Sequence, residues 1–419
     1  MRTALPLLAL TVLTGSGCRE PVAVAPAGAE LVLAAPAAAV GAGPWLDGVV
    51  AGARLLLLDP ARPDEPPVDL AGGLAAVGPP AIDSAGRRVV FPARATAEDR
   101  AALWECAVDG RGRRLLAEVP GEVLGATLLP DGRAAFAATV PDEAGPSRDL
   151  PASALFTVAA DGGIERITFA GPARDPATLP DGRIVYAQWL PAAEGRPAPG
   201  SFVLFTVHPD GSGAAPLHGM HGEPGRARRP RPRPEGGLEH LLLPPGGPPE
   251  TRLVDWGSPR AACSPARSAA PPRPTVLPAG WRVLDRVPAG PRPRPQGHLS
   301  SLRPGTAFGR LLAIDARRDG RGASVRLRTS DGVLGTVPLQ ADGSFFALVP
   351  VDRPLWLDLL DRTGAVLETG RSPFWLRPGE NRICVGCHEN PETAPPNRRP
   401  AAALLEPLDL SAAAAEVGR

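Results

Sequence analysis

Short apolar runs that alternate with turns containing aspartate and glycine fill the middle of the chain. One turn-and-strand unit occurs three times at intervals of 48 and 50 residues, and a second unit alternates with it at intervals of 52 and 49 residues. Glycine favours tight hairpins, because it tolerates the positive φ angle that these turns need. The pattern therefore predicts a small antiparallel sheet that recurs about every 50 residues. The turn aspartates are Asp83, Asp131 and Asp181 in the first unit and Asp109, Asp161 and Asp210 in the second.

Repetition of this sheet predicts a β-propeller over residues 46–285. A single sheet exposes both faces, whereas sheets arranged around an axis bury their faces and leave only short edges. A degraded copy starts at Pro234, and a partial copy precedes the series at Leu55. We count four convincing blades and expect one or two more. The proline-Asp-Gly turns resemble those of the TolB-like propeller family.

A second β-domain follows a linker of residues 286–305 that is rich in proline and arginine. Over residues 306–380, apolar and polar residues alternate in short runs between glycine-containing turns, as in Val325–Arg328. This period of two predicts antiparallel strands. The expected fold class is all-β, with an N-terminal propeller, a small antiparallel β-sandwich and a short haem-binding tail of residues 381–419.

The N-terminus predicts export and a lipid anchor. Residues 1–18 have the features of a signal peptide, because Arg2 precedes an apolar run too short to span a bilayer. The small residues before Cys18 resemble the lipobox of bacterial lipoproteins, in which the cysteine is lipidated, although Gly15 stands where that family prefers leucine. An ordinary cleaved signal peptide is the alternative. Residues 19–45 are predicted to be a tether.

The predicted location is the periplasmic side of a membrane. Arg19 follows the lipidation site in place of an aspartate, which favours the outer membrane by resemblance to enteric lipoprotein sorting. No later segment reaches about 18 uninterrupted apolar residues, so no spanning helix is expected.

Composition gives little indication of a partner. The net charge is +1, and all 45 basic residues are arginine, which is typical of a GC-rich gene. We expect no nucleic-acid partner, and we interpret the arginine cluster at residues 228–233 as a solvated loop. Cys106 lies in a strand-like run and is expected to be a buried free thiol. A disulfide between Cys106 and Cys263 is the alternative in an exported protein.

The sequence Cys-Val-Gly-Cys-His at residues 384–388 is the sharpest chemical motif. Cys384 and Cys387 can each form a thioether with a haem vinyl group, and His388 can then bind the iron. A zinc site and a dithiol redox pair are the alternatives. A closed zinc site needs a second ligand pair, which does not follow. A thioredoxin-like pair opens a helix in a βαβ unit, whereas the surroundings are all-β. We therefore expect one covalent haem c.

The second axial ligand is less well defined. Residues 389–419 contain no His, Met or Tyr. His298 in the linker is the first candidate, and a solvated loop histidine is the alternative. The next candidates are His218, Met220 and His221. Residues expected to shield the porphyrin or pair with its propionates are Phe374, Trp375, Arg377, Arg382, Arg398 and Arg399.

The order of these features resembles proteins that contain the middle domain of the hydrazine synthase alpha subunit. The similarity rests on Gly297-His298, on the Asp342–Phe346 turn and strand, on the run Arg371–Glu380 before the motif, and on Pro395–Arg398 after it. The resemblance implies the propeller, the β-domain and haem attachment. Larger relatives continue into further haem-binding regions, and hydrazine synthesis needs partner subunits and several haems. We therefore do not expect this chain to make hydrazine alone.

Three functions are compatible with this organisation. The first is electron transfer or redox sensing by a haem lipoprotein, with an unidentified partner docked on the propeller. The second is a binding or scaffold module in which the haem is structural or vestigial. The third is a small haem enzyme with an open iron position. No Ser/His/Asp set or other catalytic constellation is recognisable in the sequence, which makes the enzyme the weakest hypothesis.

Overall fold

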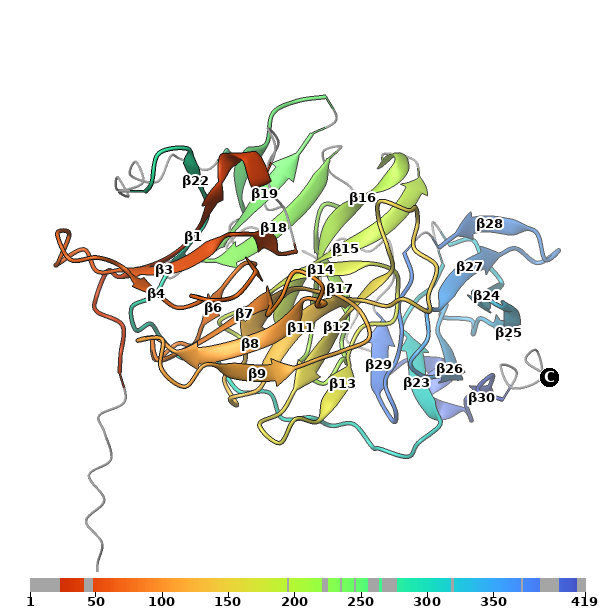
Figure 1. Cartoon of the computed structure of the whole chain (residues 1–419). Coiled ribbons are helices and arrows are strands. Elements are labelled where there is room, and N and C mark those ends of the chain that lie inside the picture. The colour runs from red at the N-terminus through yellow and green to blue at the C-terminus, as the bar shows by residue number, and fades with distance from the viewer. Residues whose placement is uncertain are drawn as a thin grey trace, which may run out of the picture.

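The computed structural model shows a chain built almost entirely from β-strands (Figure 1). Within the described residues, the helices are two short 3-10 turns, Ala37–Ala39 and Ala401–Leu404. The all-β prediction is confirmed. The residues described are 23–40, 48–193, 196–220, 225–233, 236–244, 246–254, 264–265, 277–317, 320–370, 372–384 and 399–412.

In the described part of the chain, five sheets form the propeller, and each is one blade. Blade one is β22 (Trp281–Pro288), β1 (Glu30–Pro36), β3 (Arg54–Leu58) and β4 (Val68–Asp69). Blade two is β2 (Val50–Ala51), β5 (Ala76–Val77), β7 (Arg88–Arg94), β8 (Ala102–Ala107) and β9 (Arg114–Ala117), with β6 (Ala81–Ile82) also paired to β7. Blade three is β10 (Val123–Leu128), β11 (Ala134–Thr139), β12 (Ser153–Val158) and β13 (Ile164–Arg166).

The remaining blades follow the same order. Blade four is β14 (Ala173–Thr178), β15 (Ile184–Ala193), β16 (Arg196–Val207) and β17 (Ala215–His218). Blade five is β18 (Arg226–Pro232), β19 (Leu238–Leu243), β20 (Glu250–Val254) and β21 (Ser264–Pro265). Neighbouring blades pack through buried apolar side chains such as Leu155 and Tyr186, which belong to one core cluster.

The repeated turns have the predicted conformation. Gly132 and Gly182 have φ angles of 90° and 86°, which a side chain would disfavour. In the turn before β11, the Asp131 carboxylate accepts a hydrogen bond from the backbone N–H of Arg133 at 3.0 Å. Asp181 does the same for Arg183 before β15 at 3.0 Å. The spacing of these turns therefore located the second strands of blades three and four correctly.

The first blade combines both ends of the propeller sequence. β1 lies between β22 and β3, so Leu33 is opposite both Asp285 and Leu55. The prediction that residues 19–45 are only a tether is wrong for β1, whose Leu31 and Leu33 are fully buried. The Ala- and Pro-rich flanks obscure this strand in the sequence. One of its two partners, β22, lies about 250 residues later in the chain.

Arginines of β18 connect blade five to its neighbours. Arg228 is buried, and its guanidinium binds the Asp175 carboxylate at 2.6 and 3.2 Å. Arg231 pairs with Asp285 of β22, which connects blade five to blade one. The prediction that this cluster is a solvated loop is wrong, because acidic side chains from two other blades compensate the buried charge.

The linker after β22 follows the propeller surface. The backbone N–H of Gln296 donates to Pro180 O at 2.9 Å, and that of Arg292 donates to Ser84 O at 2.8 Å. The Arg294 guanidinium donates to Pro130 O. These acceptors belong to the equivalent turns of blades four, two and three, so the extended linker crosses successive blades before it reaches the second domain.

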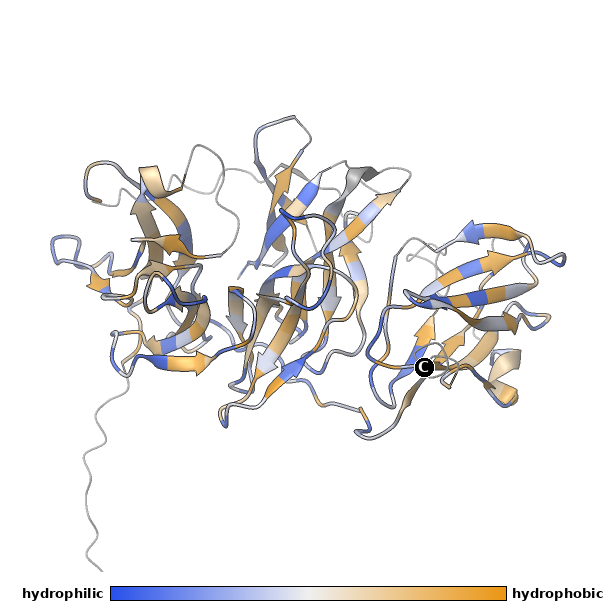
Figure 2. Ribbon diagram, turned by 45° about the vertical axis from the view of Figure 1, so that its right-hand side comes forward, coloured by the Kyte–Doolittle hydropathy of each residue, from blue (hydrophilic) through white to orange (hydrophobic). Residues whose placement is uncertain are grey.

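Two facing sheets form the sandwich beside the propeller (Figure 1). Apolar and polar residues alternate along its strands (Figure 2), and side chains such as Leu327 and Phe345 fill the space between the sheets. One sheet is β25 (Gly332–Pro338), β24 (Ser324–Thr329), β27 (Trp356–Leu360) and β28 (Val366–Thr369). The other is β29 (Asn381–Cys384), β23 (Phe308–Ala313), β26 (Phe345–Pro350) and β30 (Leu408–Asp409).

The sandwich differs from the predicted one at two edges. β29 and β30 pair in parallel with β23 and β26, whereas the interior pairs are antiparallel. Both edge strands come from residues 381–419, which were expected to form a separate tail. Parallel addition needs a long connection between the paired strands, and the local alternation pattern does not reveal such a connection.

Candidate functional site

The first cysteine of the haem motif ends an edge strand of the sandwich. Cys384 is the last residue of β29 and lies opposite Ala313 of β23. Its carbonyl accepts a hydrogen bond from Ile314 N at 2.9 Å. The half-buried thiol is free and packs against the sandwich core, whereas the Ile383 side chain is 64% exposed. The strand therefore fixes the position from which the motif continues.

The described part of the motif fits covalent haem attachment. A thioether needs a thiol that is not consumed in a disulfide, and Cys384 meets this condition. Cys387 and His388, which supply the other thiol and the imidazole, lie outside the described residues, as does Cys18. Elsewhere, Cys106 is buried with a free thiol, as predicted, and burial raises the pKa of this thiol to about 12.

The strand that carries Cys384 is bound to the propeller. The Glu380 carboxylate accepts hydrogen bonds from Gly213 N at 3.0 Å and from Arg377 N at 2.8 Å. The Arg382 guanidinium donates to the carbonyls of Ala214 and Trp375. The turn between β16 and β17 thus holds the segment that leads into the motif.

Two residues expected to surround the haem have other partners. Trp375 is 1% exposed, belongs to a propeller core cluster and donates its indole N–H to Gly211 O at 2.9 Å. Arg377 donates to Asp210 O at 2.9 Å and to the Asp352 carboxylate at 2.7 Å, and it also pairs with Glu165. Both side chains join the two domains, and their predicted haem contacts stay predictions. Local sequence does not show a contact with a turn about 165 residues earlier.

His298 lies in a polar cluster on the same turn. Its Nε2 is 2.9 Å from Asp210 Oδ2, and Ser300 Oγ donates to the same oxygen at 2.6 Å. The ring stacks on that of His208, with centroids 4.3 Å apart. Burial alone would raise the pKa of Asp210, but hydrogen bonds from Ser212, Ser300 and His298 outweigh it and hold that pKa far below its usual range. Iron binding through Nε2 of His298 would require the bond to Asp210 to break, and this ligation stays a prediction.

The second group of predicted ligands lies elsewhere. His218, at the end of β17, faces His240 of β19, and their ring centroids are 5.3 Å apart. Met220 packs against a propeller core cluster, and His221 lies outside the described residues. Sequence reasoning missed His240, because its neighbours form an ordinary apolar strand with no motif.

No helix in the described ranges is long and apolar enough to span a membrane. Within the same ranges, no group of three or more His, Cys, Asp or Glu side chains is arranged to hold a metal ion.

The fold and the motif define a propeller protein with a fused β-sandwich domain. Residues 309–389 match the family model of the hydrazine synthase alpha subunit middle domain, and the match includes the whole motif. No curated protein matches the sequence.

A solved structure shows the same architecture. Kuenenia stuttgartiensis hydrazine synthase aligns with a TM-score of 0.68 and 15% identity, over 90% of this chain and 72% of that chain. This similarity extends over both domains and shows a shared fold. TolB from Acinetobacter baumannii aligns over 86% of this chain and 67% of its own, with 10% identity and a TM-score of 0.41. A TolB-type protein from Agrobacterium tumefaciens aligns over 54% of this chain and 85% of its own, with 16% identity and a TM-score of 0.38.

Proposed function

We propose that this protein is an exported c-type haem protein that transfers electrons or senses redox state. The main support is that the match to the hydrazine synthase alpha middle domain includes the complete motif. The motif begins at Cys384, a free thiol at the end of β29. Cys384 and Cys387 would hold one haem c, and His388 would be an axial ligand. When bound, a haem supplies one-electron redox chemistry at iron.

The chain's own contribution is to position the motif. Glu380 and Arg382 bind β29 to the propeller through Gly213 and Ala214, so the first thiol stands at a defined place beside the blades. A partner that docks on the propeller would then lie in a fixed relation to the haem-bearing strand. His298, which follows the linker residue Gln296 that is hydrogen-bonded to blade four, is retained as the proposed second ligand.

Export and anchoring complete the proposal. Residues 1–18 would direct the chain to the periplasm, and lipidated Cys18 would hold it at a membrane, with the outer membrane favoured by Arg19. The replacement Cys18→Ser should release the protein into the soluble fraction. An unchanged membrane fraction would exclude the lipid anchor and leave the haem proposal in place.

The second candidate function is a binding or scaffold module with a structural haem site. The closed five-blade ring, with β1 between β22 and β3, favours it, because such a ring offers a rigid surface for a protein partner. In either case, hydrazine synthesis by this chain alone is not proposed.

Absorption spectra distinguish these functions. Spectra of the purified protein would be recorded oxidised, reduced, and reduced with carbon monoxide. Electron transfer predicts reversible cycling of the haem bands with little response to carbon monoxide. A haem that does not cycle favours the binding module, whereas a strong response to carbon monoxide shows an open iron position and favours a haem enzyme.

A further inference from the structure

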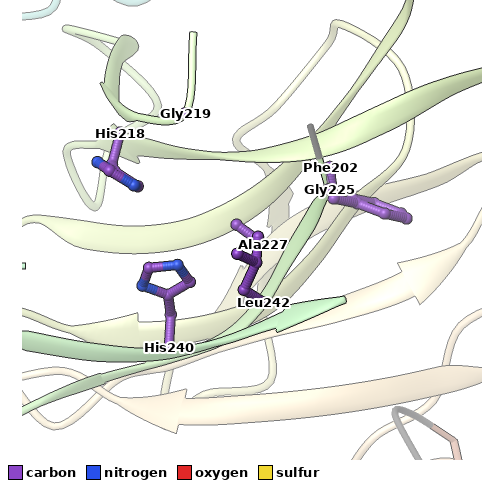
Figure 3. Close-up of a pocket in the computed structure, with 7 residues that line it drawn as sticks. All are labelled: Phe202, His218, Gly219, Gly225, Ala227, His240 and Leu242. Atoms are coloured by element: carbon purple, nitrogen blue, oxygen red, sulfur yellow. The ribbon is translucent and has the colours of Figure 1, made fainter. Parts of the chain in front are cut away.

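A small pocket between blades four and five contains two facing histidines. His218 comes from β17 and His240 from β19, and Figure 3 shows their rings on facing sides of the pocket. The enclosed space is about 20 Å³, which is enough for one water-sized particle and far too small for a porphyrin. The residues that line it are Phe202, His218, Gly219, Gly225, Ala227, His240 and Leu242.

The separation of the two rings suits a shared metal ion. Their centroids are 5.3 Å apart, and the ring planes make an angle of 51°. Two imidazoles bound to one tetrahedral zinc ion, each with a Zn–N bond of about 2.05 Å, have centroids about 5 Å apart. Among the described lining residues, His218 and His240 carry the polar side chains, and the others are glycine or apolar.

His240 offers a buried ring nitrogen to a metal ion. Its side chain is 1% exposed, and its Nδ1 has no hydrogen-bond partner. Imidazole nitrogens are ligands for zinc, copper and nickel.

We propose that His218 and His240 bind one transition-metal cation, with zinc as the reference ion, at the contact between blades four and five. The two imidazoles would be the ligands that the protein supplies to this ion. This site is separate from the haem motif and does not depend on it.

The test measures zinc retained by the full-length protein after removal of all metal with a chelator, addition of Zn²⁺ and gel filtration. The parent carries Cys384→Ala and Cys387→Ala, because free thiols of the motif also bind zinc. We expect one zinc ion per chain in this parent and its loss in both His218→Gln and His240→Gln. His208→Gln, which removes an imidazole outside the pocket, should keep the ion.

Thermal unfolding provides the second measurement. Zinc should raise the Tm of the parent and of His208→Gln and leave the Tm of folded His218→Gln unchanged. His218 is only partly buried, so this variant decides the result if His240→Gln does not fold. A parent that retains no zinc, or equal retention in the His218 variant, would overturn the proposal. Haem staining of the unmodified protein reports separately on the proposed function.

Discussion

At the scale of single residues, burial controls the charge of His240. The imidazole is enclosed between two blades, and its pKa falls from 6.5 to about 3 because the charged form is poorly solvated there and lies near Arg252 and His218. In the unfolded chain the same imidazole has its ordinary pKa. Between pH 6.5 and 3 the unfolded state therefore binds more protons than the folded state, and acidification favours unfolding.

This difference predicts a pH-dependent loss of stability. From pH 7 to pH 5, His240 should lower the free energy of unfolding by about 2 kcal/mol. His240→Gln lacks this contribution. Between pH 7 and pH 5, its free energy of unfolding should therefore fall by about 2 kcal/mol less than that of the wild type. Urea denaturation of both proteins at the two pH values measures it. Identical pH dependence would show that His240 already titrates normally in the folded protein.

At the scale of elements, β1 shows what holds the propeller closed. It supplies the strand between β22 and β3, and Leu33 is fully buried in the first core cluster. We predict that Leu33→Ala lowers the free energy of unfolding by about 2–5 kcal/mol, as expected for a large-to-small change in a packed core. Denaturant titration provides the measurement.

A matched control lies in the same N-terminal segment. Val24 is 42% exposed, so Val24→Ala should change the stability by less than about 1 kcal/mol. If Leu33→Ala is equally mild, residues 30–36 behave as the tether suggested by the sequence, and the closed ring is wrong.

Some elements could be predicted from sequence because their signal is local. The turns at Asp131 and Asp181 carry their own geometry, since the aspartate side chain bonds the backbone two residues later. β1 and β18 could not be predicted in this way. β1 pairs with β22, which lies far along the sequence, and the arginines of β18 are buried against an aspartate of blade four.

The same distinction applies to the candidate site. The Cys-Val-Gly-Cys-His spacing at residues 384–388 is complete within five positions, so the sequence shows it directly. The roles of Trp375 and Arg377 depend on the β16–β17 turn, which no local pattern connects with them. His240 matters only because blade five places it against His218 of blade four.

At the scale of the whole molecule, Arg377 joins the two domains. It is 5% exposed and connects Asp352 of the sandwich with Glu165 and the Asp210 carbonyl of the propeller. Arg377→Met leaves Asp352 and Glu165 without this cation and should lower the stability by about 3 kcal/mol. We expect calorimetry to show the sandwich unfolding separately, at a lower temperature than the propeller.

The control for this change is Arg362→Met, because Arg362 lies in an exposed turn of the sandwich. This variant should unfold like the wild type. A single transition at the wild-type temperature in Arg377→Met would show that the domain contact does not depend on this guanidinium.

Covalent haem is the central claim, and a haem-stained denaturing gel tests it most directly. The protein would be expressed with its signal peptide in a host that has a working c-type maturation system and a control cytochrome. Because thioether bonds survive denaturation, we predict a stained band for the wild type and none for the double replacement Cys384→Ala with Cys387→Ala. A wild-type band that never stains, beside a stained control cytochrome, would contradict the claim and leave the propeller as a binding module.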